Sequence, residues 1–217
     1  TFDIEVIQSA NDGYKSWDTR PASLNITETY TPINEYTKLE YIESTGTQYI
    51  DTGIYSKPNI SVVAGIMFNS LGDTRWFGST NTILATNTNR IPTRINGVWN
   101  DEYSTEIVAN KKYSIRLNLL SNKYELSINN EVQQSVTKTI STETDYTMSI
   151  FMPTNSSVRR GYLNGKLYSL KIYDNNALVR NFIPCENSSG VVGLYDTVTK
   201  TFYTNAGTGA FVAGSAV

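Results

Sequence analysis

Apolar and polar residues alternate with a period of two along most of this chain, and this pattern is the strongest constraint on its fold. Every second position is apolar in residues 113–119, 124–128, 146–152 and 168–172. Since neighbouring side chains of a β-strand point to opposite faces, each segment is predicted to be a strand with one buried and one exposed face. Residues 60–68 are more continuously apolar, which predicts a central strand covered on both faces. No segment shows sustained helical periodicity.

Short turn sequences separate these strands. Residues 121–122 (Ser-Asn) predict a hairpin between the first and second alternating segments. Further turn candidates contain residues that tolerate positive φ: Asn96-Gly97, Asn129-Asn130, Asn164-Gly165 and Asp174-Asn175-Asn176. About a dozen short strands at this spacing predict a sandwich or barrel. The abundance of Thr (27), Asn (22) and Ser (21) among 217 residues agrees with a β-rich, polar-surfaced protein.

Composition excludes several functional classes. The chain has no His, which excludes His-dependent triads, His general bases and His-ligated metals. Its single cysteine, Cys185, excludes an internal disulfide and a Cys-cluster metal site. The formal charge of -2 and the lack of basic runs argue against nucleic acid as a partner, and no apolar stretch has the length of a membrane span.

The first 36 residues differ in character from the rest. They contain one short alternating segment and a Thr/Pro-containing stretch, which predicts a linker or the tail of a preceding module. The alternative is that they supply the first strand of the main domain. Because residues 1–5 have neither a basic start nor an apolar segment, we expect no signal peptide there and interpret the chain as an excised piece of a longer protein. Residues 37–217 are predicted to form the main domain.

Three groups of sequence strings carry a family resemblance. The first is residues 39–53 (LEYIESTGTQYIDTG). The second is residues 165–174 (GKLYSLKIYD) with 178–185 (LVRNFIPC), and the third is residues 193–196 (GLYD) with 201–205 (TFYTN) and 207–211 (GTGAF). Together they resemble laminin-G-like modules of the concanavalin A-like lectin/glucanase superfamily, of the kind found in bacteriophage tail receptor-binding proteins and in surface proteins of gut bacteria.

This resemblance implies an all-β, two-sheet antiparallel jelly-roll sandwich. It also implies a glycan-binding or adhesion function, an extracellular location on a virion tail or bacterial surface, and a place in a longer, oligomeric fibre or surface protein. No cofactor is expected. Laminin-G-like modules often hold one calcium ion, and Asp73 and Asp101 are loop carboxylates of suitable hardness. However, no Asp-x-Asp-x-Asp cluster assigns such a site.

The matching strings also have a structural interpretation. Gly193 predicts a β-bulge or a close backbone contact. Pro184 is expected to end strand pairing, which leaves Cys185 as a small core residue near a strand end. A nucleophilic role for Cys185 is not favoured, because no basic residue stands beside it in the sequence.

Glycoside hydrolysis is the catalytic alternative, since the superfamily includes glucanases. A retaining enzyme needs two carboxyl groups about 5.5 Å apart across the sugar. Glu143 and Asp145 are the nearest candidates, but no third carboxylate continues their alternate spacing. Asp101 and Glu102 are adjacent, so on a strand they would face opposite ways. Both pairs are expected in solvated loops, so we predict that the chain is not an enzyme.

Residues 90–103 provide the best candidate for sugar binding. A sugar needs an aromatic surface for its C–H face and amide or carboxylate partners for its hydroxyl groups. The candidate residues around the Asn96-Gly97 turn are Arg94, Asn96, Trp99, Asn100, Asp101 and Tyr103. Trp99 is predicted to be the stacking surface, and the alternative is that it covers the edge of the sandwich. Trp76 is a second aromatic candidate, for which burial in the core is the alternative. A third is the loop 154–157 followed by Arg159 and Arg160.

Two functional classes therefore remain open beside the hydrolase. One is a non-catalytic carbohydrate-binding module for a cell-surface glycan. The other is an architectural module that spaces or decorates a fibre without binding sugar. Convergence of aromatic and amide side chains in one exposed concavity would favour binding, and a flat Thr/Ser surface would favour architecture.

Overall fold

A computed structural model of the chain describes residues 35–101, 105–153 and 161–217. In these residues the regular structure consists of β-strands, all paired antiparallel, and contains no α-helix. Accordingly, the described residues hold no helix that could cross a membrane. Most of the predicted linker lies outside them, so its role stays a prediction. Tyr36, at its end, already belongs to the first strand.

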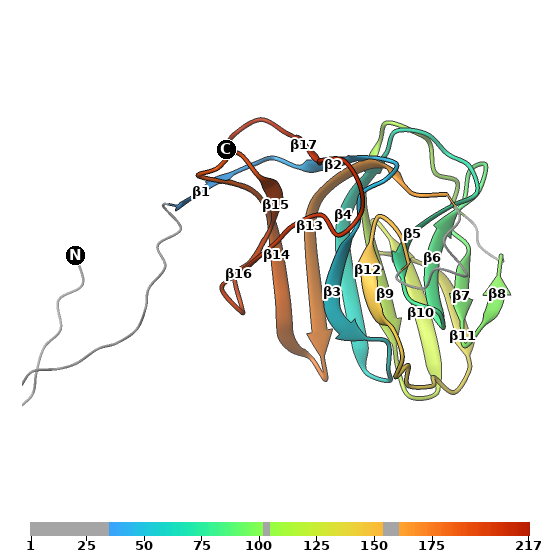
Figure 1. Cartoon of the computed structure of the whole chain (residues 1–217). Coiled ribbons are helices and arrows are strands. Elements are labelled where there is room, and N and C mark those ends of the chain that lie inside the picture. Colours follow the sequence, from blue (N-terminus) through green and yellow to red (C-terminus); the bar gives the residue numbers. More distant parts are fainter. Residues whose placement is uncertain (1–34, 102–104, 154–160) are drawn as a thin grey trace, which may run out of the picture. The chain divides into compact units, whose positions relative to one another are not determined.

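The larger of two sheets forms one layer (Figure 1). Its main path is, in spatial order, β11 (Glu131–Thr137), β10 (Lys123–Ile128), β9 (Lys112–Leu119), β4 (Ile60–Phe68), β13 (Asn164–Asp174), β14 (Ala177–Asn187), β15 (Val192–Asp196) and β16 (Thr201–Tyr203). Three short strands pair beside this path: β1 (Tyr36–Lys38) with β14, β2 (Ile42–Thr45) with β13, and β17 (Val212–Ala213) with β2.

The smaller sheet forms the second layer. Its order is β3 (Ile50–Tyr55), β12 (Thr147–Ile150), β5 (Thr74–Gly78), β6 (Thr82–Thr86), β7 (Thr93–Ile95) and β8 (Val98–Asn100). In Figure 1 this sheet lies in front of β4, β9, β10 and β11 of the larger one. The two layers confirm the predicted all-β sandwich.

The core lies between the sheets and is built by the alternating pattern. On β4 and β9 the apolar residues at every second position are buried, while the intervening residues are half-buried or exposed. Phe68 of β4 meets Trp76 of β5 edge to face, with ring centroids 5.8 Å apart. Such a pair contributes about 0.5–1.5 kcal/mol beyond its area burial.

Three of the predicted asparagine turns are confirmed. Asn96-Gly97 joins β7 to β8, Asn129-Asn130 joins β10 to β11, and Asn175-Asn176 joins β13 to β14. Both central residues of each turn have positive φ, which is the geometry of a type I′ turn. This turn matches the twist of the flanking strands, and Asn and Gly tolerate its backbone conformation. The predicted hairpin of β9 and β10 is also present.

Other local predictions were wrong. Asn164-Gly165 is no turn but the start of β13, where Gly165 pairs with Phe68. Pro184 does not end its strand: β14 continues to Asn187, and Pro184 stands opposite Leu194 of β15. Proline is tolerated there because pairing with β13 stops at Phe182. Residues 60–68 do form a central strand, but only one of its faces is buried.

The third group of matching strings contains a buried carboxylate. Asp196, at the end of β15, is fully buried. Its Oδ1 accepts hydrogen bonds from the N–H groups of Asn181 (2.8 Å) and Val198 (3.1 Å), and its Oδ2 accepts one from the Thr199 hydroxyl (2.7 Å). Arg180 Nε lies 3.7 Å from Oδ2. Asp196 therefore ties β14 to the turn that leads into β16.

Gly193 makes the close backbone contact that was one of its two predicted roles. A Cβ atom at this position would lie 2.3 Å from the carbonyl oxygen of Tyr203 on β16 and 2.9 Å from Phe202 Cζ. The pairing of β15 with β14 continues past Gly193 without a register shift, so no bulge is present; the pairing with β16 ends next to it, at Leu194. The glycine allows β16 and the Phe202 ring to approach β15 closely.

Candidate functional site

Among the concavities on the surface of the described residues, one contains part of the predicted site. It is a hollow of about 310 Å³ beside β8, which we call the Trp99 hollow. It is lined by Val98, Trp99, Asn100, Asp101, Tyr124, Val136 and Lys138. Trp99 is 40% exposed, and the Arg75 guanidinium lies 5.6 Å from its ring centroid. The structure thus brings Trp99, Asn100 and Asp101 together as predicted.

Two other predicted residues, Asn96 and Arg94, form hydrogen bonds around the β7–β8 turn and do not line the Trp99 hollow. The Asn96 amide donates to the carbonyl of Thr139 (2.6 Å) and accepts from the N–H (3.1 Å) and hydroxyl (2.7 Å) of Ser141. The Arg94 guanidinium donates to the carbonyls of Gly97 (3.1 Å) and Thr80 (2.8 Å). These contacts hold the β7–β8 hairpin against neighbouring segments, so these hydrogen-bonding groups are already engaged within the protein.

The remaining predicted aromatic residues do not extend this hollow. Trp76 is fully buried and packs against Phe68 and Phe77, which corrects the suggestion that it lines a binding face. Alternation along β5 does not explain this burial, because Trp76 and Phe77 are both fully buried and the pairing with β6 shifts register between Arg75 and Phe77. Tyr103 lies outside the described residues, as do the loop 154–157, Arg159 and Arg160, so their predicted roles stay predictions.

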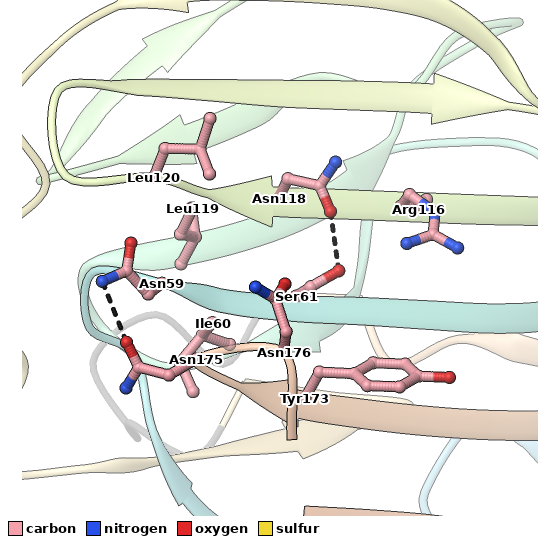
Figure 2. A pocket seen from close by; sticks show the side chains of 10 residues that line it. All are labelled: Asn59, Ile60, Ser61, Arg116, Asn118, Leu119, Leu120, Tyr173, Asn175 and Asn176. Carbon is pink, nitrogen blue, oxygen red and sulfur yellow. Dashed lines mark hydrogen bonds between the residues drawn. The ribbon is translucent and has the colours of Figure 1, made fainter. Parts of the chain in front are cut away.

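Another, larger concavity lies on the outer face of the large sheet, and we call it the asparagine groove (Figure 2). Its volume is about 700 Å³, more than twice that of the Trp99 hollow. It is lined by Asn59, Ile60, Ser61, Arg116, Asn118, Leu119, Leu120, Tyr173, Asn175 and Asn176. A volume of this size lies within the range of small-molecule sites in proteins.

Strand register explains why these residues meet. Ser61 on β4 stands opposite Asn118 on β9 and, on its other side, opposite Tyr173 on β13. These three residues therefore form a row across three neighbouring strands, on the face that points away from the core. Arg116 lies two residues before Asn118 and shares its face. The type I′ turn places Asn175 and Asn176 at the end of this row.

Hydrogen bonds within the asparagine groove hold part of its lining in position. Ser61 donates to Asn118 Oδ1 at 2.6 Å, and Asn59 Nδ2 donates to Asn175 Oδ1 at 3.1 Å, as Figure 2 shows. The Asn175 N–H also donates to the Asn59 carbonyl at 3.0 Å. These bonds fix the amides before any ligand arrives, which reduces the entropy lost on binding.

Three other side chains of the asparagine groove are uncommitted. In the part of the chain that the structure describes, Arg116, Tyr173 and Asn176 have no side-chain hydrogen bond, ion pair or ring contact. Figure 2 shows that they come from β9, β13 and the turn after β13. Together they offer a cation, an aromatic surface with a hydroxyl group, and an amide.

Sequence reasoning missed the asparagine groove for a specific reason. The alternation in residues 113–119 placed Asn118 on an exposed face, and the Asn175-Asn176 turn was recognised. Residues 60–68, however, were expected to be covered on both faces, so Ser61 was not singled out. The alternation also does not reveal that β4 pairs with both β9 and β13, although these strands lie far apart in the sequence. Only this pairing order forms the row of three polar residues.

The two carboxylates considered for catalysis, Glu143 and Asp145, differ in burial. Glu143 is 5% exposed rather than solvated, which corrects the prediction of a solvated loop, and its Oε1 accepts from the N–H groups of Thr144 (3.2 Å) and Asp145 (3.3 Å). Asp145 is exposed. Glu143 therefore stabilises its own turn. Among the described residues, no group of three or more His, Cys, Asp or Glu side chains could hold a metal ion.

Comparisons with known proteins bear on the fold. No protein-family model and no curated protein matches the sequence. A solved structure from Bacteroides ovatus, of a protein provisionally described as carbohydrate-binding, gives a TM-score of 0.61 and 13% identity over 82% of this chain and 61% of that chain. A heptameric SAP-like pentraxin from Limulus polyphemus gives a TM-score of 0.47 and 10% identity over 68% and 79%.

The likeness to the Bacteroides ovatus protein shows a shared fold, and at 13% identity it shows nothing more. It confirms the jelly-roll sandwich predicted from the alternation and the sequence strings. This chain spans 61% of the length of that protein, less than two thirds of it. The pentraxin's TM-score is too low to add to this conclusion.

Proposed function

We propose that this chain is a non-catalytic carbohydrate-binding module and that the asparagine groove is its binding surface. The observation that carries the proposal is the convergence of Tyr173, Arg116 and four asparagines in one exposed concavity. Among the two non-catalytic classes that the sequence leaves open, this convergence favours binding over architecture.

The chemistry of the asparagine groove suits a sugar. An asparagine amide both donates and accepts hydrogen bonds, as a sugar hydroxyl does. The half-buried ring of Tyr173 offers an apolar surface to the C–H face of a pyranose, and its hydroxyl remains available for a polar contact. Short amide side chains also lose little rotamer entropy on binding.

The biological setting is part of the proposal. We infer an extracellular module of a phage tail receptor-binding protein or a bacterial surface protein, which recognises a cell-surface glycan. Support comes from the sequence strings that resemble such modules, and from the shared fold with a protein provisionally described as carbohydrate-binding.

Affinity at a single site is expected to be weak. An open groove with one aromatic ring suggests a Kd on the order of 0.1–1 mM, or about -4 to -5 kcal/mol. Stable attachment would then require several copies in an oligomeric fibre or on a surface, where avidity multiplies affinity by roughly 10² or more. This expectation agrees with a module that belongs to a longer protein.

A glycan array probed with the intact chain tests the proposal, and two variants locate the site. Tyr173→Ala should weaken binding about tenfold, which corresponds to ~1.4 kcal/mol, while Trp99→Ala should leave binding unchanged. Both side chains are at least partly exposed, so neither change should alter the melting temperature by much.

Each other outcome has a definite meaning. Loss of binding in Trp99→Ala alone would place the site in the Trp99 hollow, as the sequence predicted. Absence of binding to any glycan or bacterial surface would support an architectural module. Release of reducing sugar that depends on Glu143 or Asp145 would show a glycoside hydrolase instead.

A further inference from the structure

One cation of the asparagine groove, Arg116, lacks a counter-charge. The side chain is exposed on β9 and, within the described residues, forms no hydrogen bond or ion pair. Lys171 of β13 is in the same condition. Both residues stand opposite Val63 of β4, one on each side, so two unpaired cations lie on this face of the sheet.

Two carboxylates beside the residues of the asparagine groove are already paired with lysines. Glu125, opposite Asn118 in the register, forms an ion pair with Lys123 at 2.8 Å, and Asp174, next to Tyr173, forms one with Lys57 at 2.6 Å. The hydrogen bond from Lys123 lowers the pKa of Glu125, so this carboxylate stays ionised beside its own partner. Neither acid is therefore left to balance Arg116 or Lys171.

The spacing of the asparagine groove suits a short acidic saccharide. Two strand spacings separate Arg116 from Tyr173 across the sheet, and two residues separate them along it. With strands about 4.8 Å apart and about 3.3 Å per residue, their Cα atoms are roughly 12 Å apart. Ser61 and Asn118 lie between them. A sugar ring stacked on Tyr173 can thus extend across these polar residues towards the guanidinium.

We propose that the asparagine groove selects acidic saccharides, with the carboxylate of a uronic acid bound by Arg116. This inference rests on the proposed function and names its ligand class. A planar carboxylate matches the two parallel N–H donors of a guanidinium, and Lys171 adds a second positive charge nearby. The chain's net charge is -2, so general attraction of polyanions would not produce the same preference.

Binding to matched saccharides tests this inference in the full chain. The probes are oligomers of galacturonate, glucuronate and mannuronate, each paired with its methyl ester, and the corresponding neutral oligomers. We expect each preferred acid to bind about tenfold more tightly than its ester. Arg116→Gln should remove this difference, so that acid and ester bind equally, and Arg116→Lys should restore only part of it because lysine lacks the bidentate geometry.

Lys38→Gln is the matched control, since it removes the same charge from an exposed site. Lys38 lies beside Cys185 of β14, and Tyr173 lies beside Leu178 of the same strand. Seven residues separate Cys185 from Leu178, so Lys38 lies roughly 23 Å from Tyr173 along the sheet. The Lys38→Gln variant should therefore keep the preference for the acid over its ester. An equal loss in Lys38→Gln would indicate general electrostatics and overturn the inference.

The remaining outcomes separate the inference from the proposed function. Binding of neutral oligomers as tightly as acidic ones, at a site sensitive to Tyr173→Ala, would overturn the acidic preference but leave carbohydrate binding in place. Binding of sulfated galactans without any uronate would overturn the carboxylate assignment. Failure of every saccharide to bind would overturn the proposed function as well.

Discussion

Replacement of Asp196 by alanine is expected to destabilise the domain by about 3 kcal/mol. The buried carboxylate accepts hydrogen bonds from two backbone N–H groups and one hydroxyl, and it lies near Arg180. Its removal leaves the half-buried N–H of Asn181 without an acceptor, which costs about 1–3 kcal/mol. The N–H of Val198 belongs to an exposed residue and can turn to water, so its loss adds less.

The charge adds a second contribution. Arg180 has a mostly buried side chain, and truncating one partner of a buried ion pair costs about 3–5 kcal/mol when the other is left without compensation. Arg180 keeps hydrogen bonds to the carbonyls of Thr52 and Val179, and Nε is 3.7 Å from the carboxylate, so only part of that cost is expected. The two contributions together give about 3 kcal/mol.

Urea unfolding of the full chain, followed by tryptophan fluorescence, measures the change. With an m-value of about 2 kcal/mol/M, the midpoint should fall by roughly 1.5 M while m stays the same. Asp196→Asn keeps one acceptor for the N–H groups and should lose less than half as much. Asp145→Ala is the control, because this carboxylate is exposed, and its effect should stay within about 0.5 kcal/mol. A loss below about 1 kcal/mol in Asp196→Ala would refute the reasoning.

Two further predictions concern burial and close packing. Burial raises the pKa of Cys185 to about 11, so the folded chain should react slowly with a thiol reagent at pH 8 and rapidly once denatured. Fast labelling of the folded chain would contradict the burial. Because the thiol ionises at a lower pH in the unfolded chain than in the folded one, the free energy of unfolding should fall as pH rises from about 9 to 11. Gly193→Ala should lower the unfolding free energy by about 2 kcal/mol, because the new Cβ meets the Tyr203 carbonyl. Gly72→Ala is the control, since its Cβ enters open space and should cost little. Equal melting temperatures for the two variants would count against the close contact at Gly193.

The parts of the fold that depend on local sequence were predictable. Alternation fixes which residues of a strand face the core, and β4 has the predicted bounds, residues 60–68. The Asn96-Gly97 and Asn175-Asn176 turns were recognised because their backbone conformation restricts which residues fit. Asn164-Gly165 has the same composition but lies within β13, because pairing with β2 and β4 outweighs its turn preference.

The binding surface was less predictable, because it depends on strand order. Trp99, Asn100 and Asp101 do lie together, since they are neighbours in the sequence. Asn96 has the right chemistry for a sugar, but its amide is occupied by Thr139 and Ser141, which the sequence places far away. The asparagine groove depends on pairing between strands that are far apart in the sequence, and no local sequence pattern predicts this pairing.

The pairing order of the large sheet has a consequence for how the domain folds. The hairpins β9–β10, β10–β11 and β13–β14 have short connections and type I′ or similar tight turns, so they can form within microseconds. The joint between β4 and β13 requires closure of a much longer loop, and such non-local pairing slows folding. Because the asparagine groove straddles this joint, its row of polar residues is completed only when the slow step is over. A ligand of the groove would therefore recognise folded chains and leave partly folded ones unbound.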